Sequence, residues 1–380
     1  MLRIPLILLL AIHSAGACIW DRDTLKEEAK GRLDTVTATT GRFDRYPARY
    51  YEMRLERVTK ELEEKPGVLD LYDDAGVACS RLGRHDDAII WMAKKAEALV
   101  SMPVEETNEE RYRYLSNLGT FLLIRWIVQP EAERSADLTD LQASETFIRQ
   151  ALQLNPDAHF GREKFQYKLI RWLLDAQSPP EYGTINFLYL EQDRMFAPRR
   201  NGGEDFTLEE ARKGLTGLIQ MGAAWESVDI FQTLQLCLHS QGSMSLAHLA
   251  YLRGRELYDS GERSFHPVEE VRAEVVPQPS GGFSEIGRVD AYFKKARAAV
   301  MQRDAEWIAY QDERYAKGMH PDTHPDFWKD WKEPEPPKFP RASFLQLAER
   351  NESLSMVVLI ALIVLVSWAV RVLWRKVSAA

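Results

Sequence analysis

The chain has 380 residues, of which 45% are hydrophobic, and its formal net charge is −8. A chain of this length and composition can bury a large core, which excludes the disordered and fibrous classes. Residues 18–353 hold all 57 acidic residues but only 45 of the 49 basic ones, without a basic stripe, and this excludes nucleic acid as an expected partner.

Residues 1–17 have the pattern of a secretory signal peptide. Arg3 precedes an apolar run from Ile4 to Ile12, and small residues at 15–17 precede the expected cleavage point. Cys18 would then begin the mature chain, and lipidation of its thiol stays open as an alternative to an unmodified cysteine. Residues 18–46 are predicted to be a polar lead-in to the helical domain.

Helical periodicity starts after Pro47, and residues 47–260 are predicted to form a domain of helical hairpins. The clearest hairpin lies in residues 66–97, where two amphipathic helices meet at a tight turn. Gly83 in this turn is expected to adopt a positive φ, and Gly76 is expected to let the partner helix approach closely.

Residues 66–97 resemble a tetratricopeptide repeat, which places aromatic residues, Gly and Ala at fixed offsets over about 34 residues. The residues that match in type are Tyr72, Gly76, Gly83, Ala88 and Met92. A similar spacing of residue types recurs in residues 108–156, which end in Ala-Leu-Gln-Leu-Asn-Pro, and in residues 229–259. The resemblance implies an all-α solenoid of stacked helical hairpins.

The resemblance also implies a binding groove for peptide segments of partner proteins, lined by the first helix of each unit. The implied groove positions are Asp70, Asp73, Val77 and Arg81 in the first unit, Arg113, Ser116, Thr120 and Leu123 in the second, and Asp229, Gln232, Leu236 and His239 in the third. The expected partners are therefore proteins or peptides, and no cofactor is expected.

Three segments follow the hairpin domain. Residues 261–285 are rich in Pro, Gly and charge and are predicted to be a linker. Residues 286–317 have the apolar spacing of one long amphipathic helix, which is expected to cap the hairpin stack. Residues 318–353 contain six prolines between Pro321 and Pro340 and are predicted to form a stiff spacer before a membrane.

Residues 354–374 are predicted to cross a membrane once. The part from Leu354 to Val370 carries no charge, and as a helix it would be roughly 26 Å long. Arg371, Arg375 and Lys376 follow, so the positive-inside rule places residues 375–380 in the cytoplasm. Nearly all of the chain would then lie outside the cytoplasm, in the periplasm of a bacterial cell.

The sequence contains no Gly-x-Ser-x-Gly, His-Glu-x-x-His, Cys-x-x-Cys or phosphate-binding Gly-rich motif, so we expect no enzyme. His320 and His324 lie close to two aspartates and are ligand types for Zn²⁺, although two prolines between and after them exclude helical i, i+4 geometry. Three functions therefore stand at this point. The first is a membrane-anchored scaffold that binds other proteins, the second is a metal-binding accessory protein or enzyme using the two histidines, and the third is a passive tether.

Overall fold

The computed structural model describes residues 19–29, 33–156, 161–175, 186–190, 206–279 and 285–340. Every regular element of these ranges is a helix, which confirms the all-α fold class. No helix in these ranges is both long enough and apolar enough to span a bilayer. The predicted signal peptide 1–17, Cys18, the spacer end 341–353, the membrane span 354–374 and the tail 375–380 lie outside them.

The described part contains fourteen α-helices and one 3₁₀-helix, all in the first of two compact units, which ends at Pro337. In chain order they are α1 (Arg22–Ala29), α2 (Thr35–Thr40), α3 (Ala48–Glu64), α4 (Asp70–Arg81), α5 (His85–Val100), η1 (Val104–Glu106), α6 (Asn108–Ile127), α7 (Glu131–Ala136), α8 (Thr139–Leu154), α9 (Arg162–Leu173), α10 (Leu208–Gln220), α11 (Val228–Ser240), α12 (Met244–Asp259), α13 (Glu269–Glu274) and α14 (Ile286–Tyr315).

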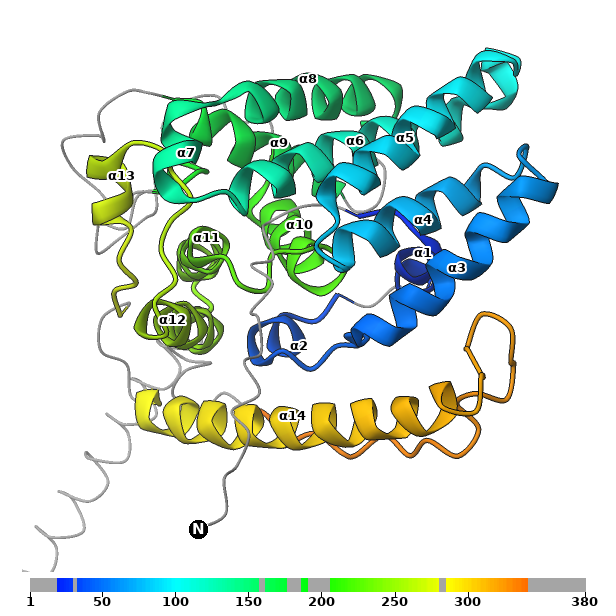
Figure 1. Ribbon diagram of the computed structural model, residues 1–380. Coiled ribbons are helices and arrows are strands. Elements are labelled where there is room, and N and C mark those ends of the chain that lie inside the picture. Colours follow the sequence, from blue (N-terminus) through cyan, green and yellow to red (C-terminus); the bar gives the residue numbers. More distant parts are fainter. Residues whose placement is uncertain are drawn as a thin grey trace, which may run out of the picture. The chain divides into compact units, whose positions relative to one another are not determined.

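Helices α4 and α5 form the hairpin predicted for residues 66–97 (Figure 1). Gly83, in the turn between them, has a φ of 74°, which confirms its expected left-handed conformation. Gly76 faces the next helix so closely that a Cβ there would lie 2.9 Å from Cε2 of Phe121 and 3.0 Å from Cε of Met92. The absence of a side chain at Gly76 therefore lets α4 pack against both α5 and α6.

The hairpin arrangement continues along the chain. Each long helix from α3 to α12 packs against the next, and the pairs α6–α8 and α11–α12 have the largest shared surfaces of the series. One hydrophobic core runs through these helices, from Ile19 before α1 to Val275 after α13. The helices thus bury a continuous core, as stacked hairpins do.

Helix α14 closes the stack. It contacts α12, α2 and α3, so it runs from the last hairpin of the series back to the first, beneath both in Figure 1. Its buried face includes Val289, Phe293, Ala296 and Val300, which recur at helical spacing. We predicted that this helix would cover the end of the stack. It is long enough to reach α3, the first long helix of the series, as well.

The predicted linker 261–285 is folded against the helical body over its described residues. Phe265, Val271 and Val275 are buried, and α13 lies within this segment. The backbone N–H of Phe265 donates to Oδ2 of Asp229 at 2.9 Å. Scattered apolar residues, which show no period in the sequence, join the segment to the hydrophobic core, and the Phe265 hydrogen bond joins it to α11.

The predicted spacer also folds back onto the body as far as Pro337. Phe327 is fully buried, and the ring of Trp328 stacks on that of Trp307 with centroids 4.1 Å apart and planes inclined by 3°. The hydroxyl of Tyr310 donates to the carbonyl of Phe327 at 2.7 Å. Aromatic residues between the prolines therefore bind the segment along α14, and it does not extend freely.

Candidate functional site

The first described residues of the chain lie inside the helical body. Trp20 is 1% exposed, and its backbone N–H donates to Oδ1 of Asn117 at 2.8 Å. Nδ2 of the same Asn117 side chain donates to the carbonyl of Trp20 at 2.9 Å. One amide from α6 thus satisfies both backbone groups of a residue that precedes α1.

The indole of Trp20 is held between α6 and α9. Its Nε1–H is shared between Oε1 of Glu163, at 3.0 Å, and Oγ of Ser116, at 3.1 Å. The guanidinium of Arg162 lies over the ring at 4.6 Å, and Tyr112 meets it edge-on at 6.1 Å between centroids. The ring and its polar edge therefore both have partners, as a buried tryptophan requires.

Charged residues extend this attachment toward α3 and α4. Arg22 donates through Nε to Oδ2 of Asp74 at 2.6 Å, and the buried Arg54 donates through Nη1 to Asp21 at 3.1 Å and to Asp23 at 2.8 Å. Burial and the nearby Asp23 charge raise the pKa of Asp21 to about 6, although Arg54 offsets part of that rise. Residues 19–23, which we call the N-terminal insert, are therefore fixed to four helices.

An ion cluster lies next to the insert. Asp73 accepts from Nζ of Lys95 at 2.5 Å and from Nδ2 of Asn117 at 3.1 Å, and Glu110 accepts from the same Lys95 at 2.7 Å. Burial raises the pKa of Asp73 to about 7, and the Lys95 ammonium offsets part of the rise. Asp70, Asp73 and Glu110 come close enough together to hold a cation, but Lys95 already occupies the space between two of them.

The groove positions implied by the sequence are mostly inside the protein. The buried ones are Asp73, Val77, Ser116, Thr120, Leu123, Asp229, Gln232 and Leu236. Arg81, Arg113 and His239 are half-buried, and Asp70 is exposed. The structure brings the first two units together around the N-terminal insert, so their inner face is lined by the expected residues but is filled by the chain itself.

The third unit's positions face a different segment. Asp229 accepts from the backbone of Phe265, and Nε2 of Gln235 on the same helix donates to the carbonyl of Gln278 at 2.6 Å. The predicted linker therefore covers the inner face of α11. No continuous open groove joins the three units in the described residues, because two segments outside the hairpins occupy its two ends.

Sequence reasoning did not select Trp20, Asn117, Glu163 or Arg54 for the site. The run Cys-Ile-Trp-Asp-Arg-Asp-Thr-Leu at residues 18–25 stands out in the sequence because it places a tryptophan among charges. That combination is the signal that could have indicated an insert needing both apolar and charged partners.

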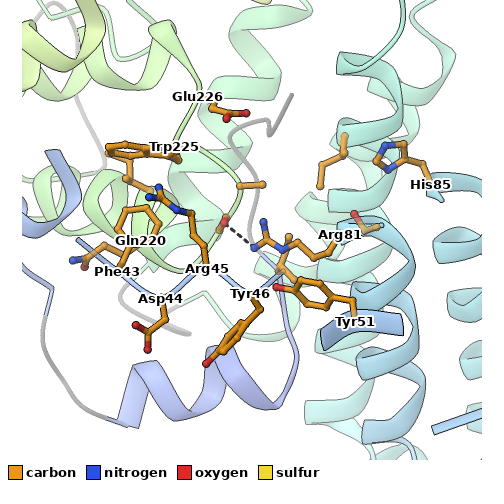
Figure 2. A pocket seen from close by; sticks show the side chains of 16 residues that line it. Phe43, Asp44, Arg45, Tyr46, Tyr51, Arg81, His85, Gln220, Trp225 and Glu226 are labelled. Atoms are coloured by element: carbon orange, nitrogen blue, oxygen red, sulfur yellow. Dashed lines mark hydrogen bonds between the residues drawn. The ribbon is translucent and has the colours of Figure 1, made fainter. Parts of the chain in front are cut away.

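A cavity of about 290 Å³ remains open beside the N-terminal insert, and Figure 2 shows its lining. Ile19 and Arg81 contribute to its wall, as do Phe43, Arg45 and Trp225. The guanidinium of Arg81 donates through Nη2 to the carbonyl of Gly222 at 3.0 Å, the bond dashed in Figure 2. Arg81, one of the implied groove positions, thus lines an open space.

No family model, no curated protein and no solved structure matches this chain. What the chain does is therefore inferred from the contacts of its own residues.

The histidines considered as metal ligands have protein partners. His320 is 4% exposed, its Nε2 lies 3.1 Å from the carbonyl of Tyr50, and its Nδ1 accepts from the backbone N–H of Asp322 at 3.1 Å. Burial lowers the pKa of His320 to about 4, so the ring is neutral at pH 7. His324 accepts from the backbone N–H of His320 at 3.2 Å. Both nitrogens of His320 and Nδ1 of His324 therefore have protein partners.

Proposed function

We propose that this chain is a membrane-anchored scaffold that holds a helical body outside the cytoplasm and acts there by binding other proteins. Residues 354–374 would supply the anchor and residues 1–17 the export signal, as the sequence predicts. The helical body would be a tetratricopeptide-like solenoid, in keeping with the resemblance of residues 66–97, 108–156 and 229–259 to such repeats.

The observation that carries this proposal is the backbone clamp of Asn117 on Trp20. The side chain donates to the carbonyl and accepts from the N–H of one residue, and this pairing is independent of which side chain the held residue carries. Neighbouring Ser116 and Glu163 then recognise the indole by accepting a hydrogen bond from its N–H. We therefore expect the inner face of these hairpins to bind a non-helical polypeptide segment through its backbone. In this structure the segment that it binds is the chain's own residue Trp20.

Partner proteins need a surface that the insert leaves free. Three exposed apolar side chains lie at neighbouring hairpin ends, which project to the right in Figure 1: Val68 in the α3–α4 turn, Val100 at the end of α5 and Val104 in η1. Val100 is 84% exposed, so its apolar side chain is open to a partner. These hairpin ends are where we place the contact with partners.

Photo-crosslinking of the full-length chain in its membrane tests the proposal. A photoreactive residue at Val100 is expected to give reproducible bands with other proteins, while one at Met301, equally apolar but on α14, gives none above background. Bands at neither position would favour the passive tether. Equal bands at both would mean that the contacts are random, and would likewise count against a scaffold.

The membrane topology is tested separately with the same full-length chain. Single cysteines at Val100 and Ser378 are treated with a thiol reagent that cannot cross membranes, and labelling is compared with that of the parent chain. The cysteine at Val100 should react in cells whose outer barrier has been opened, and the cysteine at Ser378 only after lysis. The reverse pattern would contradict the proposed orientation.

A further inference from the structure

The cavity shown in Figure 2 has an unusual wall. Aromatic rings form much of it, with Phe43 and Trp225 in an edge-to-face pair at 5.4 Å and Tyr51 on another side. The side chains of Arg45, Arg81 and His85 also line it. One nitrogen of each is buried without a hydrogen-bond partner among the described residues, and these nitrogens (Nη1 of Arg45, Nε of Arg81 and Nδ1 of His85) are closed to solvent and so do not face the cavity. Arg81 as a whole is only half-buried, so the rest of its guanidinium is what a molecule in the cavity can reach.

The arginines in this wall differ in how their charges are balanced. Arg45 pairs with Asp304, and the lining carboxylate Asp44 pairs with Arg303. Arg81 forms no ion pair with any residue in the described ranges, and its one protein acceptor there is the carbonyl of Gly222. The guanidinium of Arg81 therefore brings a positive charge to the cavity that the surrounding carboxylates do not neutralise.

The other titratable groups of the wall leave that charge in place. Burial lowers the pKa of His85, so its imidazole is neutral at pH 7 and adds a polar atom but no charge. Glu226 also lines the cavity and lies apart from Arg81 in the view of Figure 2. A ligand with one negative charge near Arg81 is thus compatible with the wall, whereas a doubly charged group would meet Glu226 and Asp44 without a second free cation.

We infer that this cavity is a binding site for a small aromatic monocarboxylate, whose carboxylate accepts from Arg81 and whose ring packs against Tyr51 and against the guanidinium of Arg45, which lies over Phe43 at 5.1 Å and over Trp225 at 5.2 Å. A planar guanidinium matches a carboxylate in geometry and charge, and Arg81 is half-buried in the wall, so part of its guanidinium can donate to such a ligand. The volume of about 290 Å³ lies at the small end of ligand pockets, roughly 300–1,000 Å³, and excludes nucleotides and other large ligands. This site is separate from the protein contacts proposed above and does not depend on them.

Access to the site is compatible with exchange of such a ligand. Phe43, Arg81 and His85 are only half-buried, so solvent reaches the wall. Ile19 of the N-terminal insert closes another side of the cavity, which means that the site is complete only when the insert is in place.

Fluorine NMR of the full-length chain in detergent micelles tests this inference, with 4-fluorophenylacetate as the probe and the uncharged 4-fluorophenylacetamide as its control. The acid is expected to bind with a Kd at least tenfold lower than that of the amide, which corresponds to about 1.4 kcal/mol. This comparison uses the unmodified protein and so does not depend on the folding of any variant.

Two variants then locate the site. Arg81→Gln should weaken binding of the acid by tenfold or more and leave the amide unaffected. Arg84→Gln removes an exposed arginine from the turn after the same helix, paired with Asp87, and should leave both unchanged. Equal affinity for acid and amide, equal loss in both variants, or tighter binding of 4-fluorobenzylphosphonate than of the acid would each overturn the assignment.

Discussion

Arg54 and Asp322 are 268 residues apart in the chain and form a forked ion pair in which Nε and Nη2 each donate to a carboxylate oxygen at 2.8 Å. Both side chains are fully buried. The same guanidinium reaches Asp21 and Asp23 of the N-terminal insert. One arginine on α3 therefore joins the beginning of the described chain to the segment that follows α14, and the helical body closes around it.

Asp322→Asn should lower the free energy of unfolding by about 3–5 kcal/mol, because it leaves a buried guanidinium without its main carboxylate. Burial alone would raise the pKa of Asp322, but the hydrogen bonds and charge of Arg54 more than offset it and hold this pKa below its ordinary value. The stabilisation is thus present above about pH 4 and declines in acid as the unfolded carboxyl protonates. Urea unfolding at pH 7 and pH 3 measures both effects.

The control for this substitution is Asp326→Asn, in the same segment but at an exposed position. Its effect on unfolding should stay within about 0.5 kcal/mol. Similar losses in the two variants would mean that Asp322 owes its importance to the local turn and not to Arg54.

The N-terminal insert gives the second prediction. Trp20→Phe keeps a ring in place but removes the N–H that Glu163 and Ser116 share, leaving a buried carboxylate with one donor fewer. We expect a loss of about 1.5–3 kcal/mol in unfolding free energy, the range for a hydrogen bond to a charged group.

Trp331→Phe is the matched control, because that indole N–H donates to Glu333 at the protein surface. Its cost should be within about 0.5 kcal/mol. Equal losses of unfolding free energy in the two variants would mean that the ring of Trp20 holds the insert by packing alone, and that its N–H contributes nothing.

How much of this structure the sequence predicts depends on how far apart in the chain the contacting residues lie. The α4–α5 hairpin, the left-handed Gly83 and the long helix α14 follow from local periodicity and turn chemistry, and the structure confirms them. The insertion of Trp20 depends on Asn117 and Glu163, 97 and 143 residues away, and no local pattern specifies such pairs.

The predicted groove shows the same division. Two of the positions implied by the offsets, Asp73 on α4 and Ser116 on α6, face the insert or its immediate partners. What covers those faces comes from outside the hairpins. Phe265 stands among polar residues, and Phe327 and Trp328 lie between prolines, so neither the predicted linker nor the predicted spacer has the helical or strand period that would have predicted packing against the body.

Gly119 provides the third prediction. A Cβ at this position on α6 would lie 2.8 Å from two side-chain carbons of Ile148 and 3.2 Å from its backbone nitrogen. Gly119→Ala should therefore force α6 and α8 apart and cost about 1–3 kcal/mol of unfolding free energy. Gly287→Ala, in α14 with open space around it, should instead add about 0.5–1 kcal/mol. Thermal unfolding of the two variants should shift in opposite directions, and a shift in the same direction would contradict the packing.

Substitutions of His320 and His324 distinguish a structural role of these histidines from a metal-binding one. His320→Ala removes a buried ring that stacks on Tyr50 at 4.6 Å and bonds two backbone groups, so a loss of about 2–4 kcal/mol in unfolding free energy is expected. His324→Ala should cost less than about 1 kcal/mol, and dialysis against EDTA should leave the melting temperature unchanged. Equal losses in the two variants, together with a lower melting temperature after EDTA, would restore the metal hypothesis.

Asp229 gives a pH-dependent prediction with a definite sign. Burial raises its pKa to about 6, although the hydrogen bond from the Phe265 backbone offsets part of the rise, and its Oδ1 has no hydrogen-bond partner in the described residues. Between about pH 4 and pH 6 the unfolded carboxyl loses its proton while the folded one keeps it, so this group makes the protein less stable as pH rises.

Asp229→Asn removes that titration but retains an oxygen that can accept from Phe265. The stability of the variant relative to the parent should therefore increase by roughly 3 kcal/mol from pH 4 to pH 7, because the two pKa values differ by about two units. Urea unfolding of both chains across this range measures the difference, with Asp326→Asn as the control for the substitution itself. A difference that stays constant with pH would show that Asp229 ionises in the folded protein as readily as in the unfolded chain, and that the segment covering α11 leaves this carboxylate accessible to water.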